Sequence, residues 1–295
     1  MAWRVICIEN PASLSLKDNK LVIKQDEEAL IPIEDINSLV LDSYGISISA
    51  NLLTSLASYK VAVTICDGNH LPASTLLPYS QHSRQSKVSR DQLAMSEPLK
   101  KQIWAKNITQ KITNQCDVMK KFEHDIDQLE SLAKNVKSGD STNRESIAAR
   151  LYFSALLDDA TRRKPIWHNS ALNYGYAIVR SAIARSVAAR GLIASQGIFH
   201  HSELNGFNLV DDLIETFRPA VDEYILSKIA INHIGADDER LNKNDRELIV
   251  DIMNQYVILN NKRYSIKHAT DAVVESFVQV IKTGSVADLI LPNII

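Results

Sequence analysis

Cysteine is scarce in this chain of 295 residues, and its three cysteines, Cys7, Cys66 and Cys116, lack the spacing of a metal site. They give no disulfide framework and fit a reducing, cytoplasmic environment. No apolar run reaches the roughly 18 residues that a membrane span requires. The first residues, MAWRVICIEN, lack the charged start and long apolar stretch of a signal peptide. We therefore expect a cytoplasmic protein without a membrane partner.

The chain also lacks an excess of either charge, because 33 Lys and Arg residues oppose 35 Asp and Glu residues. A net charge of −2 does not indicate nucleic-acid binding, so any contact with DNA must come from local basic patches. The remaining composition is ordinary, with 45% hydrophobic and 23% charged residues. Such a composition predicts a folded core, and the length is sufficient for two domains.

Residues 1–79 contain short runs in which apolar and polar residues alternate between turn residues, which is typical of strands. Two such runs flank Lys17-Asp18-Asn19-Lys20 and predict a hairpin. One helix over Ala50–Tyr59, capped by Ser49, interrupts the predicted strands. The pattern predicts a β-rich, sandwich-like domain over 1–79. A polar, Ser-rich and basic segment, 80–91, is expected to be an exposed connector.

From Gln92 onward the spacing of apolar residues is helical almost throughout. We therefore predict an all-α domain over 92–295, which also contains the candidate functional residues, and a two-domain α+β protein as a whole. The predicted helical segments are a long stretch over 92–136 that is broken near Pro98, followed by 143–157, 169–194, 208–216, 219–233, 244–260 and 268–282.

Glu145 lies near the start of the predicted helix 143–157. At helical spacing it shares a side with Ala149, Tyr152 and Leu156, and such a partly buried side is unusual for a carboxylate without a partner. The alternative is a capping box over Thr142–Glu145, in which the glutamate binds back to the start of its own helix. The two roles exclude each other if the carboxylate points into the helical bundle.

The segment 208–216 predicts an amphipathic helix with a concentrated acidic sector made of Asp211, Asp212 and Glu215. A solvated face near a helix N-terminus is one interpretation. The other is a cation site, because three carboxylates without interleaved lysines repel one another and a bound cation would relieve that repulsion.

His200 and His201 lie just before this acidic helix. A single histidine is more often structural than a ligand, but one imidazole among carboxylates is compatible with Mg²⁺ or Mn²⁺. Zinc is less suitable, because no cysteine and no second well-spaced histidine join the set. A glutamate, a histidine and a further acid form a site with spare coordination positions that can act on phosphodiesters.

Four segments together resemble the CRISPR adaptation integrases (the "Cas-one" family), and especially their type II branch. The N-terminal match extends over 30–78, and the resemblance covers nearly the whole chain in the expected order. At the acidic helix this chain has IETFRP where the family often has MEPFRP, so Thr216 replaces a proline beside Glu215. The helical matches are NRESIAARLYF (143–153), LNYGYAIVR (172–180) and GIFHHSELNGFNLVDDLIETFRP (197–219).

The resemblance implies a metal site for Mg²⁺ or Mn²⁺ with Glu145, His200 and Glu215 as ligands and catalytic residues. It implies supporting roles for Asp212 and Asp211. His200 would be a ligand, a proton carrier, or both.

The resemblance also implies the reaction. A 3′-hydroxyl of a captured double-stranded DNA fragment attacks a phosphodiester at the edge of a CRISPR repeat. One phosphodiester replaces another, so no nucleotide cofactor is needed, and no phosphate-binding loop pattern is present.

The implied partners are double-stranded DNA, a second copy of the chain, and the small ferredoxin-like adaptation protein ("Cas-two") in a heterohexameric complex. The resemblance to the type II branch further implies association with the effector nuclease of that system. The β-rich domain is expected to form the dimer and to dock the small partner.

Basic residues are expected to bind the DNA backbone, although each is also compatible with a solvated surface charge. On the helix of the second motif, Arg180, Arg185 and Arg190 are further candidates, and Arg180 and Arg218 are alternatively expected to orient carboxylates. The candidates in the connector and before Pro165 are Arg84, Lys87, Arg90, Arg162, Arg163 and Lys164.

Two other functions remain possible from the sequence. One is a free-standing metal-dependent nuclease that uses the same site for hydrolysis. The other is a DNA-binding scaffold whose site holds no metal.

Overall fold

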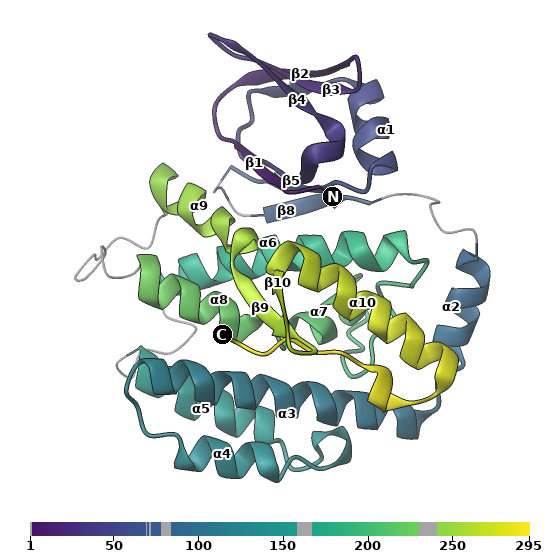
Figure 1. The fold of residues 1–295 in the computed structure, drawn as a ribbon, viewed down its shortest axis with the longest axis vertical. Helices are drawn as coiled ribbons and strands as arrows, with labels where there is room; N and C mark the ends of the chain where they lie inside the picture. Colours follow the sequence, from purple (N-terminus) through teal and green to yellow (C-terminus); the bar gives the residue numbers. More distant parts are fainter. Residues whose placement is uncertain (1, 69, 71, 78–83, 158–166, 230–240) are drawn as a thin grey trace.

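The computed structural model describes residues 2–68, 70, 72–77, 84–157, 167–229 and 241–295. A strand-rich N-terminal part lies above a larger helical part in Figure 1. The predicted α+β fold class, with strands first and helices after them, is confirmed. Within the described residues, no helix combines the length and apolarity needed to cross a membrane.

The first N-terminal sheet has the strand order β1-β5-β7-β8. Strands β1, β5 and β7 are parallel, and β8 is antiparallel to β7. All six residues of β5 are buried, as expected for a parallel strand that is covered on both faces. The bounds are Arg4–Ile8 for β1, Ile36–Leu41 for β5, Ala62–Cys66 for β7 and Pro72–Leu76 for β8.

The second sheet has the order β4-β3-β2-β6 and packs over the first. The predicted hairpin joins β2 and β3, with Asp18 and Asn19 both at positive φ in the turn. The predicted cap is also present, because Ser49 accepts the backbone N–H of Leu52 at the start of α1. The bounds are Ala12–Lys17 for β2, Lys20–Lys24 for β3, Glu28–Pro32 for β4, Ile46–Ile48 for β6 and Ala50–Ser58 for α1.

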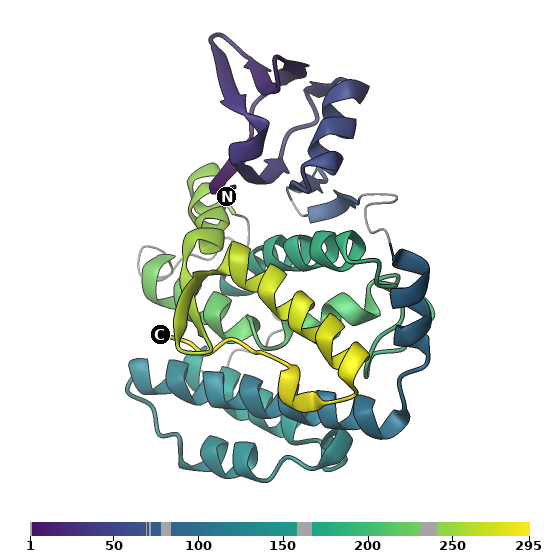
Figure 2. The same cartoon turned by 45° about the vertical axis from the view of Figure 1, so that its right-hand side comes forward.

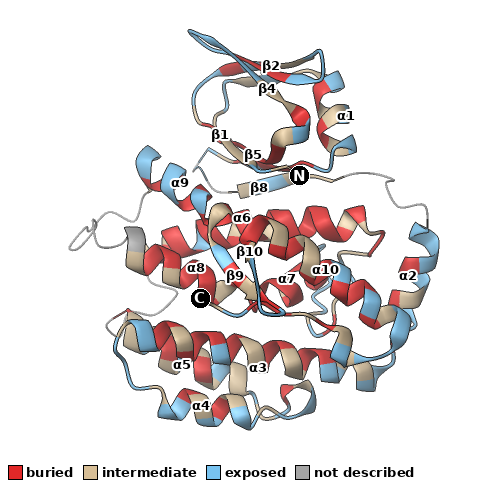
Figure 3. Cartoon of the chain, viewed as in Figure 1, coloured by how far each residue is buried: buried red, intermediate tan, exposed pale blue. Residues whose placement is uncertain are grey.

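The helical part is built around α6, which is buried along most of its length and lies between the first sheet and the other helices (Figures 2 and 3). Ser181 of α6 accepts a hydrogen bond from Thr64 of β7 and bonds with Thr75 of β8. The α-helices of this part, α6 included, are α2 (Gln85–Leu93), α3 (Glu97–Lys121), α4 (Asp127–Lys134), α5 (Arg144–Leu156), α6 (Trp167–Ala189), α7 (Asn208–Ile214), α8 (Arg218–Tyr224), α9 (Lys243–Val250) and α10 (Ile266–Thr283).

Three segments differ from the sequence prediction. The helical stretch predicted over 92–136 has a second break, over residues 122–126 between α3 and α4. The helix predicted over 244–260 ends at Val250, and a hairpin follows from β9 (Tyr256–Leu259) and β10 (Lys262–Ser265). Asn260 and Asn261 both have positive φ, a turn geometry that a helix does not tolerate. In the expected connector, residues 80–83 lie outside the described residues, and residues 85–91 belong to helix α2.

Buried charges join the first sheet to α9 at the carboxyl ends of β1 and β5. Arg246 Nε lies 2.6 Å from Asp42 Oδ2 and 3.7 Å from Glu9 Oε1. The Glu9 side chain is only 3% exposed. Burial and the neighbouring Glu247 carboxylate raise the pKa of Glu9 to about 7, against the opposing effect of Arg246 and Lys243.

Replacing Glu9 by Gln should therefore stabilise the protein at alkaline pH. The raised pKa means that the folded state favours the protonated acid, so its stabilising contribution is lost as the pH rises from 4.5 to about 7. We expect Glu9→Gln to raise Tm by roughly 2–4 °C near pH 8.5, and the gain to shrink toward pH 5. Thermal unfolding followed by circular dichroism tests this expectation. A Tm difference that is the same at every pH would contradict it.

Candidate metal centre

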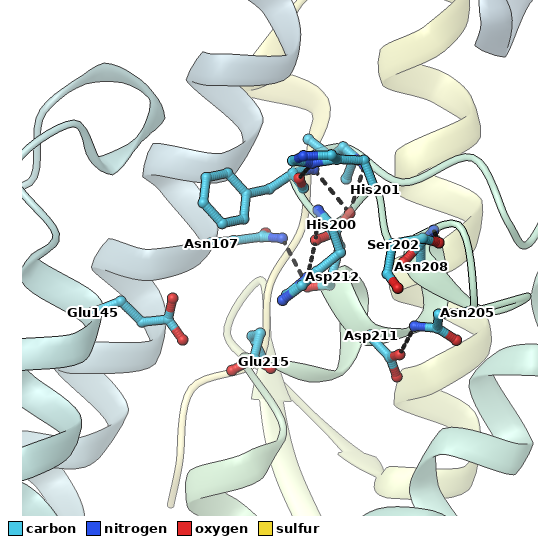
Figure 4. A network of polar contacts seen from close by, with 12 residues as sticks. Asn107, Glu145, His200, His201, Ser202, Asn205, Asn208, Asp211, Asp212 and Glu215 are labelled. Atoms are coloured by element: carbon cyan, nitrogen blue, oxygen red, sulfur yellow. Dashed lines mark hydrogen bonds and ion pairs between the residues drawn. The ribbon is translucent and has the colours of Figure 1, made fainter.

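Glu145 lies in the first turn of α5, and its carboxylate does not cap that helix. The cap is Asp140, whose two carboxylate oxygens accept the backbone N–H groups of Arg144 at 2.8 Å and Glu145 at 3.0 Å. Thr142, the expected cap, has a buried hydroxyl without a hydrogen-bond partner among the residues that the structure describes, and Asn143, which directly precedes the helix, has a φ of 52° and makes no side-chain cap hydrogen bond. The capping-box interpretation is therefore wrong for Glu145. Its carboxylate points toward the segment that contains Glu215 (Figure 4).

A lysine joins Glu145 to Glu215. Lys111 of α3 places Nζ at 2.6 Å from Glu145 Oε1 and 2.5 Å from Glu215 Oε2. The lysine side chain is 8% exposed, and that of Glu215 is 6% exposed. Two carboxylates from different helices thus converge on one buried positive charge.

Glu215 directly follows α7 and is held by two cations. Arg218 Nε binds its second oxygen, Oε1, at 2.8 Å, and the guanidinium also lies over the Tyr176 ring. Burial acts to raise the pKa of Glu215, but the charges of Lys111 and Arg218 outweigh it and lower the pKa to about 2. Glu215 is therefore a carboxylate, and a possible metal ligand, throughout the neutral range.

His200 is oriented by Asp212, which is fully buried. His200 Nδ1 lies 2.7 Å from Asp212 Oδ1, and this contact, together with the carboxylate charge, raises the pKa of His200 against the effect of its burial. Asp212 also accepts the backbone N–H groups of Ile198, Phe199 and His200. With Nδ1 engaged, Nε2 is the nitrogen of His200 that can bind a metal or accept a proton.

The loop before His200 depends on a close backbone approach at Gly197. A Cβ atom there would lie 2.1 Å from the carbonyl oxygen of His200 and 2.8 Å from Asp212 Oδ2, so no other residue fits. The loop residue Phe199 stacks its ring on Trp104 of α3, with ring centroids 4.3 Å apart. Both rings meet the His200 imidazole edge-on, which further restrains its position.

Asp211 is separated from the other two acids of α7. It binds Arg180 of α6, with Nε–Oδ1 and Nη2–Oδ2 distances of 2.5 and 3.1 Å, and also accepts from Asn205. The three carboxylates predicted to form one repulsive cluster are therefore neutralised separately. Asp211 pairs with Arg180, Asp212 with the loop and His200, and Glu215 with Lys111 and Arg218.

The three predicted ligands line two hollows. Glu145 and Glu215 line a cavity of about 240 Å³, whereas His200 lines a groove of about 900 Å³ beside the Trp104–Phe199 stack. In the part of the chain that the structure describes, no three His, Cys, Asp or Glu side chains form a group ready to hold a metal. The residues nevertheless fit a divalent cation, because two carboxylates already converge on a positive charge.

The predicted DNA-binding residues have different surroundings. Arg84, Lys87 and Arg90 are all exposed, and Lys87 Nζ lies 3.0 Å from Asp91. Residues 162–164, which include Arg162, Arg163 and Lys164, lie outside the described residues. On α6 and directly after it, the structure places the candidates in internal ion pairs: Arg180 with Asp211, Arg185 with Asp271, and Arg190 with Asp271 and Glu275.

Lys111 and Asp140 were not predicted from the sequence. Lys111 belongs to a row of buried polar residues, Asn107, Lys111 and Gln115, at four-residue spacing on α3. This row lies beside the apolar face that includes Ile108 and Ile112. Polar residues repeated at that spacing beside a buried stripe are a signal that could have indicated a charged interior.

The chain is similar to known proteins along most of its length. Residues 5–258 match the model of the family "CRISPR associated protein Cas1". The chain is 38% identical to the CRISPR-associated endonuclease Cas1 of Neisseria meningitidis serogroup C (strain 8013), and the match covers all of this chain and 97% of that protein.

Two solved structures share the fold at 19% sequence identity. A casposase bound to an integration product superimposes with a TM-score of 0.77 over 95% of this chain and 90% of its own. A chain of a Cas6-RT-Cas1–Cas2 complex superimposes with a TM-score of 0.73 over 97% of this chain and 36% of its own. From the family match and the full-length identity, this chain belongs to the CRISPR associated protein Cas1 family.

Proposed function

We propose that this protein is the integrase of CRISPR spacer acquisition. It joins the 3′-hydroxyl ends of a double-stranded DNA fragment to the edges of the CRISPR repeat by metal-dependent transesterification. The observation that most supports this proposal is the convergence of Glu145 and Glu215 on one positive charge, next to a histidine whose Nδ1 is engaged by Asp212. Family membership and the endonuclease name of the relative from Neisseria meningitidis agree with it.

We propose Glu145, Glu215 and His200 as the ligands of Mg²⁺ or Mn²⁺. Such an ion lowers the pKa of an attacking hydroxyl and neutralises charge on the phosphate. Asp212 fixes the tautomer of His200, so Nε2 is presented as ligand or proton acceptor. Arg218 keeps Glu215 ionised and oriented. Asp211 has an indirect role, because it holds Arg180 and the loop residue Asn205 against α7.

In the proposed reaction, the 3′ oxygen of the fragment forms a bond to phosphorus as the bond from phosphorus to the adjoining 3′ oxygen breaks. The proton of the attacking hydroxyl leaves, and the departing oxygen takes up a proton. The number of phosphodiester bonds is unchanged, so the reaction needs no nucleotide cofactor.

The proposed partners follow from the same function. The casposase of known structure is bound to an integration product, and the Cas6-RT-Cas1–Cas2 complex contains Cas2, so we propose DNA and Cas2 as partners here. We further propose a homodimer that forms a heterohexamer with Cas2 and, for a type II system, associates with the effector nuclease. The exposed edge strand β4, in which Leu30 is 51% exposed, makes the strand-rich part a suitable assembly surface.

A strand-transfer assay separates this proposal from two alternatives. The chain is incubated with Cas2, a labelled DNA fragment and a supercoiled plasmid that contains the repeat, in the presence of Mg²⁺ or Mn²⁺. Joined product supports the integrase, nicks without joining support a free-standing nuclease, and DNA binding without either supports a scaffold.

The Glu145→Gln variant should lose strand transfer by about 100-fold or more while its DNA binding is retained. The amide keeps the shape of the side chain but is a poor ligand for a hard cation. Glu130→Gln, which neutralises a glutamate on α4 whose side chain is 39% exposed, is the matched control and should integrate normally. Joining and fluorescence anisotropy are measured on the same samples. A Glu145→Gln protein that integrates at the wild-type rate would remove Glu145 from the metal centre.

His200 and Asp212 should differ in how they affect stability. His200→Ala removes a side chain that is 42% exposed, so it should abolish joining with little change in unfolding free energy. Asp212→Ala leaves three backbone N–H groups of the loop without their acceptor, which should cost about 1–3 kcal/mol or more in addition to activity. Urea unfolding measures both variants. Equal stability losses would contradict the positioning role of Asp212.

A further inference from the structure

A lysine ammonium fills the space between the two carboxylates that we propose as metal ligands. Lys111 Nζ lies 2.6 Å from Glu145 and 2.5 Å from Glu215, and its side chain is 8% exposed. One oxygen of each carboxylate, Glu145 Oε1 and Glu215 Oε2, points at Nζ. A metal ion with both of these oxygens as ligands would therefore have to occupy the space that Nζ occupies. Two cations cannot share it, because like charges at such short range in a buried site repel strongly.

The cavity beside Lys111 offers another position for its ammonium. This cavity of about 240 Å³ is lined by Lys111, Gln115, Glu215 and Asp222, among others. Gln115 lies one helical turn beyond Lys111 on α3 and is 1% exposed. Its carbonyl oxygen Oε1 is buried and accepts no hydrogen bond from the described residues. An orphaned buried acceptor is costly, so a cation that reached it would be stabilised there.

We propose that Lys111 is a resident counter-cation of the site, which a divalent metal displaces toward Gln115. In the absence of metal, the ammonium pairs with the half-buried Glu145 and shares the buried Glu215 with Arg218. When metal binds, Nζ leaves the carboxylates and donates to Gln115 Oε1 in the adjoining cavity. This inference rests on the proposed metal centre and identifies what the metal must compete with.

If a metal displaces Lys111 toward Gln115, replacing Lys111 and replacing Gln115 should change the metal affinity in opposite directions. Lys111→Met removes the competitor, so Mn²⁺ should bind at least about tenfold more tightly. Gln115→Leu removes the acceptor to which the ammonium moves, so Mn²⁺ should bind about 3- to 10-fold more weakly. In the double variant, Gln115→Leu should no longer weaken Mn²⁺ binding, because there is no Lys111 ammonium left for Gln115 to accept.

The experiment is titration of the full-length chain, free of DNA, with Mn²⁺ by calorimetry and electron paramagnetic resonance. Tm in a chelator should fall for Lys111→Met and recover with Mn²⁺ by more than it does in the wild type. Lys267→Met is the matched control, because Lys267 is also a buried lysine but lies on α10 and binds Asn254. That control should change Tm without changing Mn²⁺ affinity.

The outcomes separate this inference from the proposed function. If the wild type binds Mn²⁺ and integrates DNA but Lys111→Met binds no more tightly, Lys111 is not a competitor and the inference alone fails. The inference also fails if Gln115→Leu lowers Mn²⁺ affinity by the same factor whether or not Lys111 is present. Binding of Mn²⁺ by Lys111→Met but not by the wild type supports it. If neither protein binds Mn²⁺, the metal centre itself is wrong.

If Lys111→Met does not fold without metal, the single variant Gln115→Leu decides the question. It removes only the uncharged acceptor and leaves Lys111 paired with Glu145 and Glu215. Weaker Mn²⁺ binding by this folded variant supports the displacement. Unchanged Mn²⁺ affinity overturns it.

Discussion

The neutralisation of buried acids on one short helix is the constraint that the site depends on. Helix α7 and the residue after it place Asp211, Asp212 and Glu215 within a single turn and a half, and none of them is fully solvated. Each obtains its own partner from a different part of the chain: Asp211 from α6, Asp212 from the loop before it, and Glu215 from α3 and α8. The surrounding helices are thereby held in register around α7, since moving any of them would leave a carboxylate unpaired.

The position of α6 explains how residues so distant in sequence reach one place. One side of this buried helix supports the first sheet through Ser181, and another side contacts α7 through Arg180. The parallel strand β5 is buried on both faces, because Leu39 and Leu41 belong to the core between the two sheets and Val40 belongs to the core of the helical part. The strand-rich part is thus attached to the same helix that supports the site, and a second attachment forms where Arg246 meets Asp42.

Much of the architecture follows from local sequence patterns. The hairpin over 17–20, the helix capped by Ser49 and the division into strands followed by helices were all predictable from alternation, turn residues and spacing. The hairpin over 256–265 was not, because its strands are short and two asparagines at positive φ can be identified only once the backbone is known. Parallel pairing of β1, β5 and β7 was also hidden, since it depends on what covers the sheet.

The acids of the site and two of its cations, Arg180 and Arg218, were predictable from the sequence, whereas Lys111 was not. Motif resemblance indicated Glu145, His200 and Glu215, and the structure brings Glu145 and Glu215 together on Lys111. Lys111 has no motif of its own, and a lysine within a long helix is normally assigned to the surface. The helix cap of α5 was missed because it comes from Asp140, inside a turn with Gly139 at positive φ rather than from the residue next to the helix.

The loop between Gly197 and α7 is held at both ends and exposed between them. Its first residues donate their amides to Asp212, and Asn205 is fixed by Asp211, so insertions at either end would displace the imidazole of His200. Leu204 between them is fully exposed. Two of the three native cysteines are buried, so a reporter attached through a thiol at position 204 would report on events a few residues from the reacting atoms without altering the residues that position them.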